Sequence, residues 1–356
     1  MSDSSRIPVA QLNRFVCQIL SRVGVGEADA VLTADALVMA DTWGVFTHGT
    51  KLLAGYVRRL EAGGIQAQAR PQIAAEGPAW AIVDGHHALG QVSGAYAMQT
   101  AVKKARATGM AYVGVKHGNH FGALGYFPCL AAQAGLIGIA VANDIPSVAA
   151  PGSRLAVTGT NPLAYAVPAA GHDPILLDMA TSTVAGGKVY MARQLGKPIP
   201  QDWLIGPDGT PTTDGALYPD RASLAPAGGH KGYGIGLLVE TLAGVVSGAS
   251  MMWQIGNWMW GEPQAPTGHG AAFLALDAEA MNADFRRRVD HIIQEVHRAP
   301  PAAGVDQVLV PGEREWHNRR RALDQGIALP ADVRKPLTEL AARFQYPLEE
   351  AREATL

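Results

Sequence analysis

Several features that mark particular protein classes are scarce in this sequence of 356 residues. It has only two cysteines, Cys17 and Cys129, and no Cys-x-x-Cys pair. Neither a disulfide framework nor a cysteine-based zinc site is therefore supported, and a reducing compartment fits best. The net charge is −2, from 29 Lys and Arg against 31 Asp and Glu, which is too weak a field to hold nucleic acid. We therefore expect no nucleic-acid partner.

Long uninterrupted apolar runs are also missing. The longest, from Gly232 to Trp253, is broken by Glu240 and rich in glycine, whereas a membrane span needs about 20 predominantly apolar residues. We expect a buried helix there and no membrane partner. The first residues carry Asp3 ahead of the apolar positions and have no apolar core, which is unlike a signal peptide. We therefore expect a cytoplasmic protein.

The sequence does contain enough apolar material for a large core, with 48% hydrophobic and 17% charged residues. Its length suits two domains or one large one. Over the first seventy residues, apolar positions recur at spacings of three and four, the pattern of amphipathic helices. We predict a helix at residues 9–23 closed by Gly24, a second through 31–38, and a third at 52–60 that ends at Gly63.

After Pro71 the pattern changes to short β-prone runs bounded by glycine or proline, which are typical of buried strands. The runs are WAIVDG, AYVGVK, LIGIAVAND, PLAYAVP, PILLDMAT and GAAFLALD, with helical stretches at 91–108 and 231–248. Several runs follow one another without a helix between them, which favours a mixed, largely antiparallel sheet. The predicted fold class is therefore α/β with a non-Rossmann sheet of this kind and a helical part built from the chain's two ends.

The glycine fingerprint of a Rossmann domain, GxGxxG at a strand-to-helix turn, is absent. Gly24 and Gly26 follow a predicted helix, and Asp29 stands where the third glycine belongs. The glycines of residues 232–236 open a helix but have the wrong spacing. A simple Rossmann domain is disfavoured, so any bound nucleotide is held by another scaffold.

Thr47 and His48 lie just ahead of the third predicted helix. In this place Thr47 could cap the helix. His48 could donate a proton to a ligand or accept one from it, and the dipole of the helix N-terminus would favour a bound carboxylate. The alternative is a cap with a surface histidine. Lys51 adds a cation one turn later, although exposed lysines are common.

The segment KHGNHFGALGY directly follows a predicted strand and places His117, Asn119 and His120 among three glycines. Titratable groups with small neighbours at a strand end suit close approach by a ligand. The alternative is a glycine-rich turn with one satisfied histidine. A metal site pairing His117 with His120 is not supported by an HExxH motif or a cysteine cluster, so we expect no metal.

Further turns after apolar runs carry short polar side chains suited to contacting phosphate or ribose. These residues are Asn143, Asp144, Thr160 and Asn161. Taken singly, each is also an ordinary turn former. Asp178 ends an apolar run, where it either bonds a ligand or an imidazole or caps a helix. Lys188 and Lys231 stand beside glycines, either as phosphate contacts or as solvated surface lysines.

The ordered set THG, NHFGALGY, GTNP, LDMATS, GK, KGYG and VLVPGE resembles the malate/L-lactate dehydrogenase family, which lacks a Rossmann fold. The resemblance runs from about Val9 to Phe344. It implies hydride transfer, with NAD or NADP, between a 2-hydroxy acid and a 2-oxo acid, or reduction of a cyclic imine acid. It also implies a homodimer and a cleft between a helical domain, placed at 1–78 with 300–356, and an α/β NAD(P)-binding domain at 79–299.

The resemblance also assigns roles to individual residues. His120 matches the family's acid/base histidine and His48 matches a histidine of the substrate pocket, and either of the two could move the proton. Substrate contacts are expected at Thr47, Lys51 and Tyr56. The cofactor contacts that the resemblance implies are Asp144, Thr160, Asp178, Met179, Ala180, Lys231, Pro311, Gly312 and Glu313. From the residue patterns above we add Asn161 and Lys188 as cofactor contacts.

Two positions depart from the family pattern. Members commonly carry Ser before the first histidine and Arg four residues after it, where this sequence has Thr47 and Leu52. An Arg would grip a substrate carboxylate as a fork. Lys51 replaces only the charge, because adjacent helical positions are about 100° apart and Lys is not bidentate. The expectation of a malate- or lactate-type substrate is therefore weakened. The alternative function is a protein that binds a nucleotide or metabolite without turnover.

The segment MMWQIGNWMW, residues 251–260, contains three tryptophans. Such a cluster either forms the wall of an apolar pocket or is buried in a dimer interface. We favour the interface. A pocket wall would indicate a substrate less polar than malate.

Overall fold

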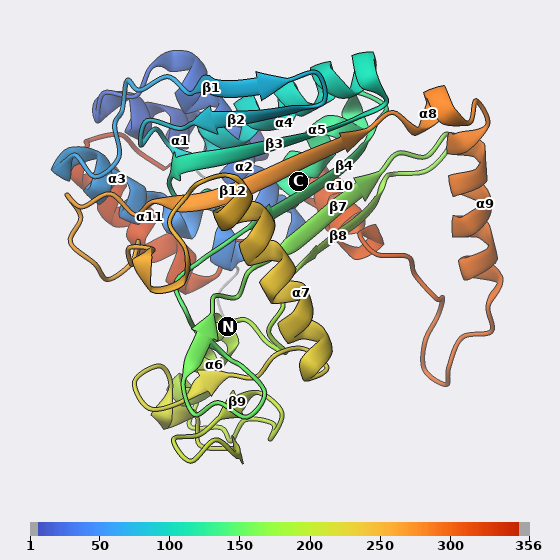
Figure 1. Ribbon diagram of the computed structural model, residues 1–356. Helices are drawn as coiled ribbons and strands as arrows, with labels where there is room; N and C mark the ends of the chain where they lie inside the picture. Colours follow the sequence, from blue (N-terminus) through green and yellow to red (C-terminus); the bar gives the residue numbers. More distant parts are fainter. Residues whose placement is uncertain (1–5, 349–356) are drawn as a thin grey trace, which may run out of the picture.

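The computed structural model describes residues 6–348 and contains a large central sheet. Its strands lie in the order β1-β2-β3-β12-β4-β7-β8 (Figure 1). Their bounds are β1 Gln72–Gly77, β2 Trp80–Asp84, β3 Met110–Gly118, β12 His269–Leu276, β4 Ile137–Ala142, β7 Leu163–Val167 and β8 Ile175–Met179. Only β2 and β3 pair in parallel; the other neighbours are antiparallel. The predicted mixed, largely antiparallel sheet is confirmed.

Strand β12 occupies the centre of the sheet although it comes late in the chain. Phe273 lies opposite Val113 of β3 on one side and Ala140 of β4 on the other. Because β12 is paired along both edges, its residues are almost all buried, and its sequence is a near-continuous apolar run.

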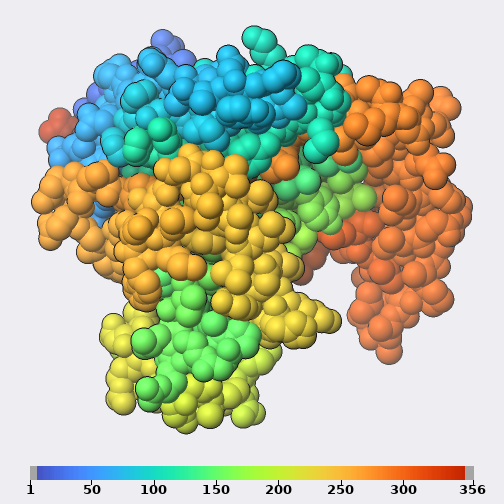
Figure 2. Space-filling view, in the orientation of Figure 1, coloured from blue at the N-terminus to red at the C-terminus, as the bar shows by residue number. Residues whose placement is uncertain are grey.

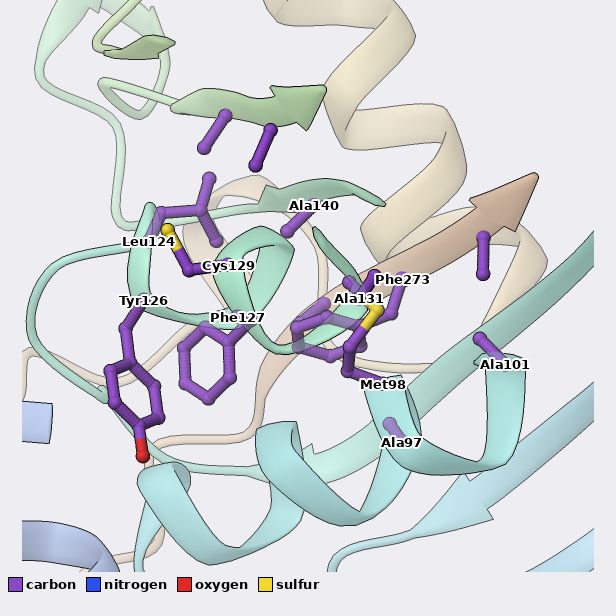
Figure 3. Packing of buried hydrophobic residues seen from close by; sticks show 14 of the residues in the cluster. Ala97, Met98, Ala101, Leu124, Tyr126, Phe127, Cys129, Ala131, Ala140 and Phe273 are labelled. Carbon is purple, nitrogen blue, oxygen red and sulfur yellow. The ribbon is translucent and has the colours of Figure 1, made fainter. Parts of the chain in front are cut away.

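Two helices cover one face of this sheet. They are α4, Gly90–Thr108, and α5, Tyr126–Gln133. Phe127 of α5 meets Phe273 of β12 edge to face, with ring centroids 5.3 Å apart (Figure 3). Around these rings the core is rich in alanine, including Ala97 and Ala101 of α4. Small side chains let the helix approach the sheet closely and leave the aromatic rings to fill the remaining volume.

The helices near the two ends of the chain share a second core. They are α1 Val9–Arg22, α2 Glu27–Trp43, α3 Leu53–Ala62, α10 Glu313–Gln325 and α11 Ala331–Arg343. Backbone hydrogen bonds between Ile7 and Ile327 tie the two ends together. The first three helices follow the predicted ones closely. The division into domains at 78 and 300 stays a prediction, and residues 1–5, with Asp3, and 349–356 lie outside the described residues.

A small lobe with its own five-stranded sheet projects from the large sheet (Figure 1). Its elements are β5 Val148–Ala149, β6 Ala156–Thr158, α6 Gly186–Gln194, β9 Leu204–Ile205, β10 Pro211–Thr212, η3 Gly215–Leu217 and β11 Ser223–Leu224. A separate cluster around Val189 and Leu204 forms its core. Strands of two or three residues carry no sequence periodicity, so this lobe was not predicted.

Helix α7, His230–Glu240, continues as the π-helix η4, Thr241–Val246, and corrects one expectation. One face packs on the large sheet through Val239 and Ala243. The opposite face is apolar but exposed, with exposed fractions between 39% and 59%, at Ile235, Leu238, Val245 and Val246. The prediction of a buried helix is therefore wrong for this face, which lies at the surface (Figure 2).

The remaining elements are short or peripheral. They are the 3-10 helices η1 Phe46–His48, η2 Thr50–Leu52 and η5 Met252–Gln254, with α8 Ala278–Met281 and α9 Phe285–Arg298. Within residues 6–348, none of the helices combines the length and apolar character that crossing a membrane requires.

Candidate active site

A cleft of about 2450 Å³ opens between the helical part, one end of the large sheet and the small lobe. Eleven of the predicted site residues line it: Thr47, His48, Lys51, His120, Asp144, Thr160, Asp178, Ala180, Lys188, Pro311 and Gly312. The other five do not: Tyr56, Asn161, Met179, Lys231 and Glu313. Residues more than 250 positions apart in the chain thus share one concave surface.

His120 follows strand β3 and is held on several sides. Its Nδ1 lies 2.8 Å from the hydroxyl of Tyr56, and the amide of Gly122 donates to the same nitrogen at 3.4 Å. The indole of Trp258 stacks on the imidazole, with ring centroids 4.1 Å apart and planes 11° from parallel. The backbone of His120 also packs against Gly90, the first residue of α4. A glycine is required there, because a Cβ would lie 2.6 Å from the carbonyl oxygen of His120. These contacts leave the imidazole little rotational freedom.

The surroundings of His120 keep it neutral. Burial, together with a smaller effect of the nearby His48, lowers its pKa to about 3, whereas Asp144 acts in the opposite direction. Burial has this effect because removing water disfavours the imidazolium form. A neutral imidazole at the edge of a cleft can accept a proton from a substrate hydroxyl.

His48 lies across the cleft from His120, with ring centroids 6.2 Å apart. It belongs to η1, and helix α3 begins only at Leu53. Thr47 therefore does not cap the helix as suggested by the sequence; its hydroxyl lies 2.9 Å from Nδ1 of His48 instead. Burial also lowers the pKa of His48, against the opposing field of Asp144.

The turn that carries His48 rests on the buried Asp41 of α2. One carboxylate oxygen of Asp41 accepts from the backbone amide of Thr50 at 3.1 Å and from its hydroxyl at 2.5 Å. The other oxygen has no hydrogen-bond partner. Burial raises the pKa of Asp41 to about 7, although the bonds from Thr50 lower it. This carboxyl is therefore partly protonated at neutral pH.

Asp144 pairs with a histidine that the sequence analysis did not single out. Nε2 of the buried His269, on β12, lies 3.2 Å from its carboxylate. Burial by itself would raise the pKa of Asp144, but the hydrogen bond and charge of His269 outweigh it, with a smaller contribution from His120, and the pKa lies below its ordinary value. Asp144 is therefore an anion that lines the cleft with His48 and His120 and pairs with His269 behind it.

Asn161 supports Asp144 from behind the cleft. Its side-chain oxygen accepts from the backbone amide of Asp144 at 3.2 Å, and its amide donates to Glu240 at 2.8 Å. The buried Glu240 also accepts from Asn143 at 3.2 Å and from the backbone of Met252 at 2.9 Å. One carboxylate thus ties helix α7 to the Asp144 turn and to the start of the tryptophan-rich segment. Sequence patterning did not indicate this role for Glu240.

Asp178, on β8, contacts the start of a helix, as one of the two sequence alternatives proposed. Its carboxylate accepts from the backbone amide of Gly125, the residue before α5, at 2.7 Å. It is also exposed to the cleft. Burial among protein atoms raises its pKa to about 6, while the amides of Gly125 and Leu124 lower it.

The predicted cations are spread over different surroundings. Lys51 lines the cleft, and its ammonium pairs with Asp332 of α11 at 2.6 Å. Lys188 lines the cleft with an exposed side chain. Lys231, in the first turn of α7, is exposed outside the cleft. Arg154, Arg221 and Arg314 also line the cleft. No sequence pattern indicated them, because isolated arginines carry no motif.

The segment around Pro311 closes the cleft from the C-terminal side. The carbonyl of Pro311 accepts from the amide of Leu176 on β8 at 3.0 Å. Glu313 turns away from the cleft: it accepts from the amide of Val310 at 2.8 Å and lies 2.8 Å from Nε2 of His297. Ala180 lines the cleft next to Asp178, and Met179 does not.

His117 and His120 do not form a pair. Nδ1 of His117 lies 2.9 Å from the carboxylate of Asp84, outside the cleft. Across residues 6–348, no three histidines, cysteines or acidic residues gather in an arrangement suited to a metal ion.

The comparisons with known proteins agree with this geometry. The family model described as malate/L-lactate dehydrogenase matches residues 7–338. Malate dehydrogenase of Pyrococcus abyssi is 37% identical over 347 residues, covering 95% of this chain and 94% of that one. The Delta(1)-pyrroline-2-carboxylate/Delta(1)-piperideine-2-carboxylate reductase of Pseudomonas putida is 33% identical over 337 residues, covering 94% and 96%. The crystal structure of malate dehydrogenase from Entamoeba histolytica aligns with a TM-score of 0.90 at 30% identity, covering 97% and 99%.

The fold and the cleft define a nicotinamide-dependent oxidoreductase without a Rossmann domain. The chain belongs to the malate/L-lactate dehydrogenase family. The predicted resemblance is confirmed, as are the fold class and the enzyme class, a dehydrogenase or reductase acting on CH–OH or C=N groups.

Proposed function

We propose that His120 is the acid/base residue of this oxidoreductase and that the cleft is its active site. The observation that carries the proposal is the setting of His120, which is fixed by Tyr56 and Trp258, kept neutral by burial, and open to the cleft. In the oxidation direction its imidazole accepts the proton of the substrate hydroxyl, and in reduction it returns a proton to the oxo oxygen or imine nitrogen.

His48 then binds the substrate from the opposite side. Its ring is within 6.2 Å of His120 and is oriented by Thr47. A substrate oxygen between the two rings can be bonded by both, which fixes the reacting carbon for hydride transfer. Lys51 supplies the positive charge for a substrate carboxylate, and Tyr56 acts through His120 because it does not reach the cleft.

The cofactor, NAD or NADP, supplies the hydride chemistry when it is bound. The cleft fits it, because exposed Lys188, Arg154, Arg221 and Arg314 line the walls and favour an anionic ligand. Asp144, Thr160, Asp178, Ala180 and the turn of Pro311 and Gly312 are the further cofactor contacts in this proposal. Asn161 and Glu313 stabilise neighbouring segments instead, and Met179 and Lys231 lie outside the lining.

We also propose that the enzyme is a homodimer of the cytoplasm. The exposed apolar face of α7 and η4, formed by Ile235, Leu238, Val245 and Val246, is the kind of surface that a second subunit covers. Both cysteines are free thiols, which fits a reducing compartment. Light scattering of the purified protein tests the dimer directly.

The test of function follows the absorbance of reduced nicotinamide. NADH and NADPH are offered in parallel against a panel of 2-oxo acids and cyclic imine acids. Oxidation with one acid supports the proposal and identifies both cofactor and substrate. Measurable binding of NADH or NADPH with no turnover for any acid would favour the alternative, a binding protein without catalysis, to which the replacement of the family arginine by Leu52 points.

A further inference from the structure

The wall of the cleft beside His120 is apolar. Leu52 lines the cleft and packs into the helical core, with 6% of it exposed. Trp258, stacked on His120, is 8% exposed. Met259 and Trp260 line the same cleft and are 41% and 74% exposed. Besides His48, a substrate at His120 therefore has hydrocarbon and indole surface for neighbours.

The tryptophan-rich segment is built into the fold by helix α3. The buried Arg59 donates to the carbonyl oxygens of Trp258 at 3.3 Å and Ala265 at 2.6 Å, and Arg58 donates to that of Met259 at 2.6 Å. Trp258 also packs so closely on α3 that a Cβ on Gly55 would lie 3.1 Å from its ring. The apolar wall is therefore preformed, and it is held by the same helix that carries Tyr56.

Positive charge is scarce at this end of the cleft. Among residues 43–52, 120–124 and 253–260, Lys51 is the only lysine or arginine. Its ammonium is engaged by the carboxylate of Asp332 at 2.6 Å. The other cations of the cleft, Lys188, Arg154, Arg221 and Arg314, belong to the small lobe and to α10. One substrate carboxylate can compete with Asp332 for Lys51. A second carboxylate at this end of the cleft would have no lysine or arginine partner.

We propose that the substrate of this enzyme is a monocarboxylic 2-oxo or 2-hydroxy acid, or the corresponding cyclic imine acid, with a large apolar side chain. The inference rests on the proposed function. The carboxylate of the substrate replaces Asp332 as the partner of Lys51. The apolar side chain of the substrate then lies on Leu52, Trp258 and Trp260. A dicarboxylic acid is rejected because its second carboxylate would lose water against this wall without gaining a partner.

The substrate panel tests the inference through kcat/KM with reduced cofactor. Phenylpyruvate and 2-oxohexanoate are expected to exceed oxaloacetate by tenfold or more, since one buried apolar contact changes specificity by about 10–200-fold. A preference for oxaloacetate would overturn this inference alone. Silence with every 2-oxo acid and cyclic imine acid would overturn the proposed function and the inference with it.

Variants of the wall locate the effect. Trp260→Ala is expected to lower kcat/KM for phenylpyruvate by about tenfold while leaving pyruvate nearly unchanged. Trp80→Ala is the matched control, because Trp80 is 44% exposed and lies outside the cleft. Leu52→Arg is expected to shift the ratio of kcat/KM values from phenylpyruvate towards oxaloacetate. Because position 52 is buried, circular dichroism first checks that this variant folds. If Leu52→Arg does not fold, Trp260→Ala alone tests the inference.

Trp260 also allows a competing explanation to be tested. If this surface were a subunit contact, Trp260→Ala would dissociate the protein and lower kcat/KM for all acids equally. Light scattering at the assay concentration separates the two cases. An unchanged molecular mass with a loss confined to phenylpyruvate is the expected result, and dissociation with a uniform loss would overturn the inference.

Discussion

The hydroxyl of Tyr56, on helix α3, lies 2.8 Å from Nδ1 of His120, at the end of strand β3. This bond joins the helical part to the end of a sheet strand, at the residue that faces His48 across the cleft. Tyr56 is fully buried, and burial raises the pKa of its phenol above the ordinary value. The phenol stays neutral at any working pH, so Tyr56 positions the imidazole and does not itself exchange charge.

Tyr56→Phe is expected to lower kcat by about tenfold and to change KM for the substrate little, because the imidazole loses a hydrogen bond of roughly 1 kcal/mol and part of its orientation. Steady-state kinetics with a saturating cofactor measure the split. The control is Tyr126→Phe, which removes a hydroxyl bonded to Asp35 at 2.9 Å. An equal loss of kcat in both variants would contradict a positioning role for Tyr56.

His120→Ala and His48→Ala are each expected to reduce turnover by about 10²–10⁴-fold, the usual cost of removing a positioned acid/base or a group that orients the substrate. Circular dichroism checks that both fold. His117→Ala is the matched control, because His117 pairs with Asp84 outside the cleft. Full activity in both cleft variants would show that the proton moves elsewhere.

The pH dependence of oxidation reports the state of His120. Because burial lowers its pKa to about 3, the imidazole that accepts the proton stays neutral from pH 9 down to pH 5. We expect kcat/KM for the 2-hydroxy acid to be nearly flat over this range, after correction for the driving force of proton release. A rate that halves near pH 6.5 would instead indicate a histidine of ordinary pKa.

Asp41 makes stability depend on pH in the opposite direction to most carboxylates. Its pKa is raised from 3.8 to about 7 by burial, so the folded state binds the proton more tightly than the unfolded state. This contribution is complete below pH 3.8 and is lost as pH rises through 7. Between pH 5 and pH 9, the stability of Asp41→Asn relative to that of the parent chain should therefore rise by about 3 kcal/mol.

Thermal unfolding of Asp41→Asn and the parent at both pH values measures this difference. The exposed Asp306→Asn serves as the control and is expected to change little with pH. If Asp41→Asn showed the same difference from the parent at pH 5 and pH 9, the carboxyl would be ionised in the fold throughout.

Glu240→Gln tests the network behind the cleft. A glutamine presents an amide donor to a site where Asn143, Asn161 and Met252 already donate. One donor is left unpaired, which costs about 1–3 kcal/mol of stability. Because Asn161 holds the Asp144 turn, KM for the cofactor should also rise. Glu279→Gln, at a surface ion pair with Arg286, is expected to leave both quantities unchanged.

Local sequence patterns predicted the helices and strands of the large sheet well. The helices α1 to α4 and the strands β2, β3, β4, β7, β8 and β12 coincide with runs of clear periodicity or apolar character. The lobe built from β5, β6, β9, β10 and β11 was not predicted, because strands of two or three residues depend on their neighbours rather than on their own pattern. The exposure of the α7 face could not be predicted for a related reason, since an apolar run does not say which face finds a partner.

The histidines of the site were found from the sequence because they stand among glycines in short motifs. Trp258 and His269 were not assigned to them, since each comes more than 130 residues after His120 and lies beside it only in the folded chain. The tryptophan-rich segment was expected at an interface, which stays a prediction, and its Trp258 stacks on the imidazole of His120. Sequence spacing carries no information on contacts of this range.

By itself, the sequence determined the class of fold, the family and the residue types available for proton transfer, because each depends on local patterns or on motifs in a set order. Only the tertiary structure decided what those residues do. Packing lowers the pKa of His120, pairs Lys51 with Asp332, directs Asn161 and Glu313 away from the cleft, and lays Trp258 over the imidazole. Burial and charge pairing arise between segments distant in the chain, so they exist only once the chain has folded.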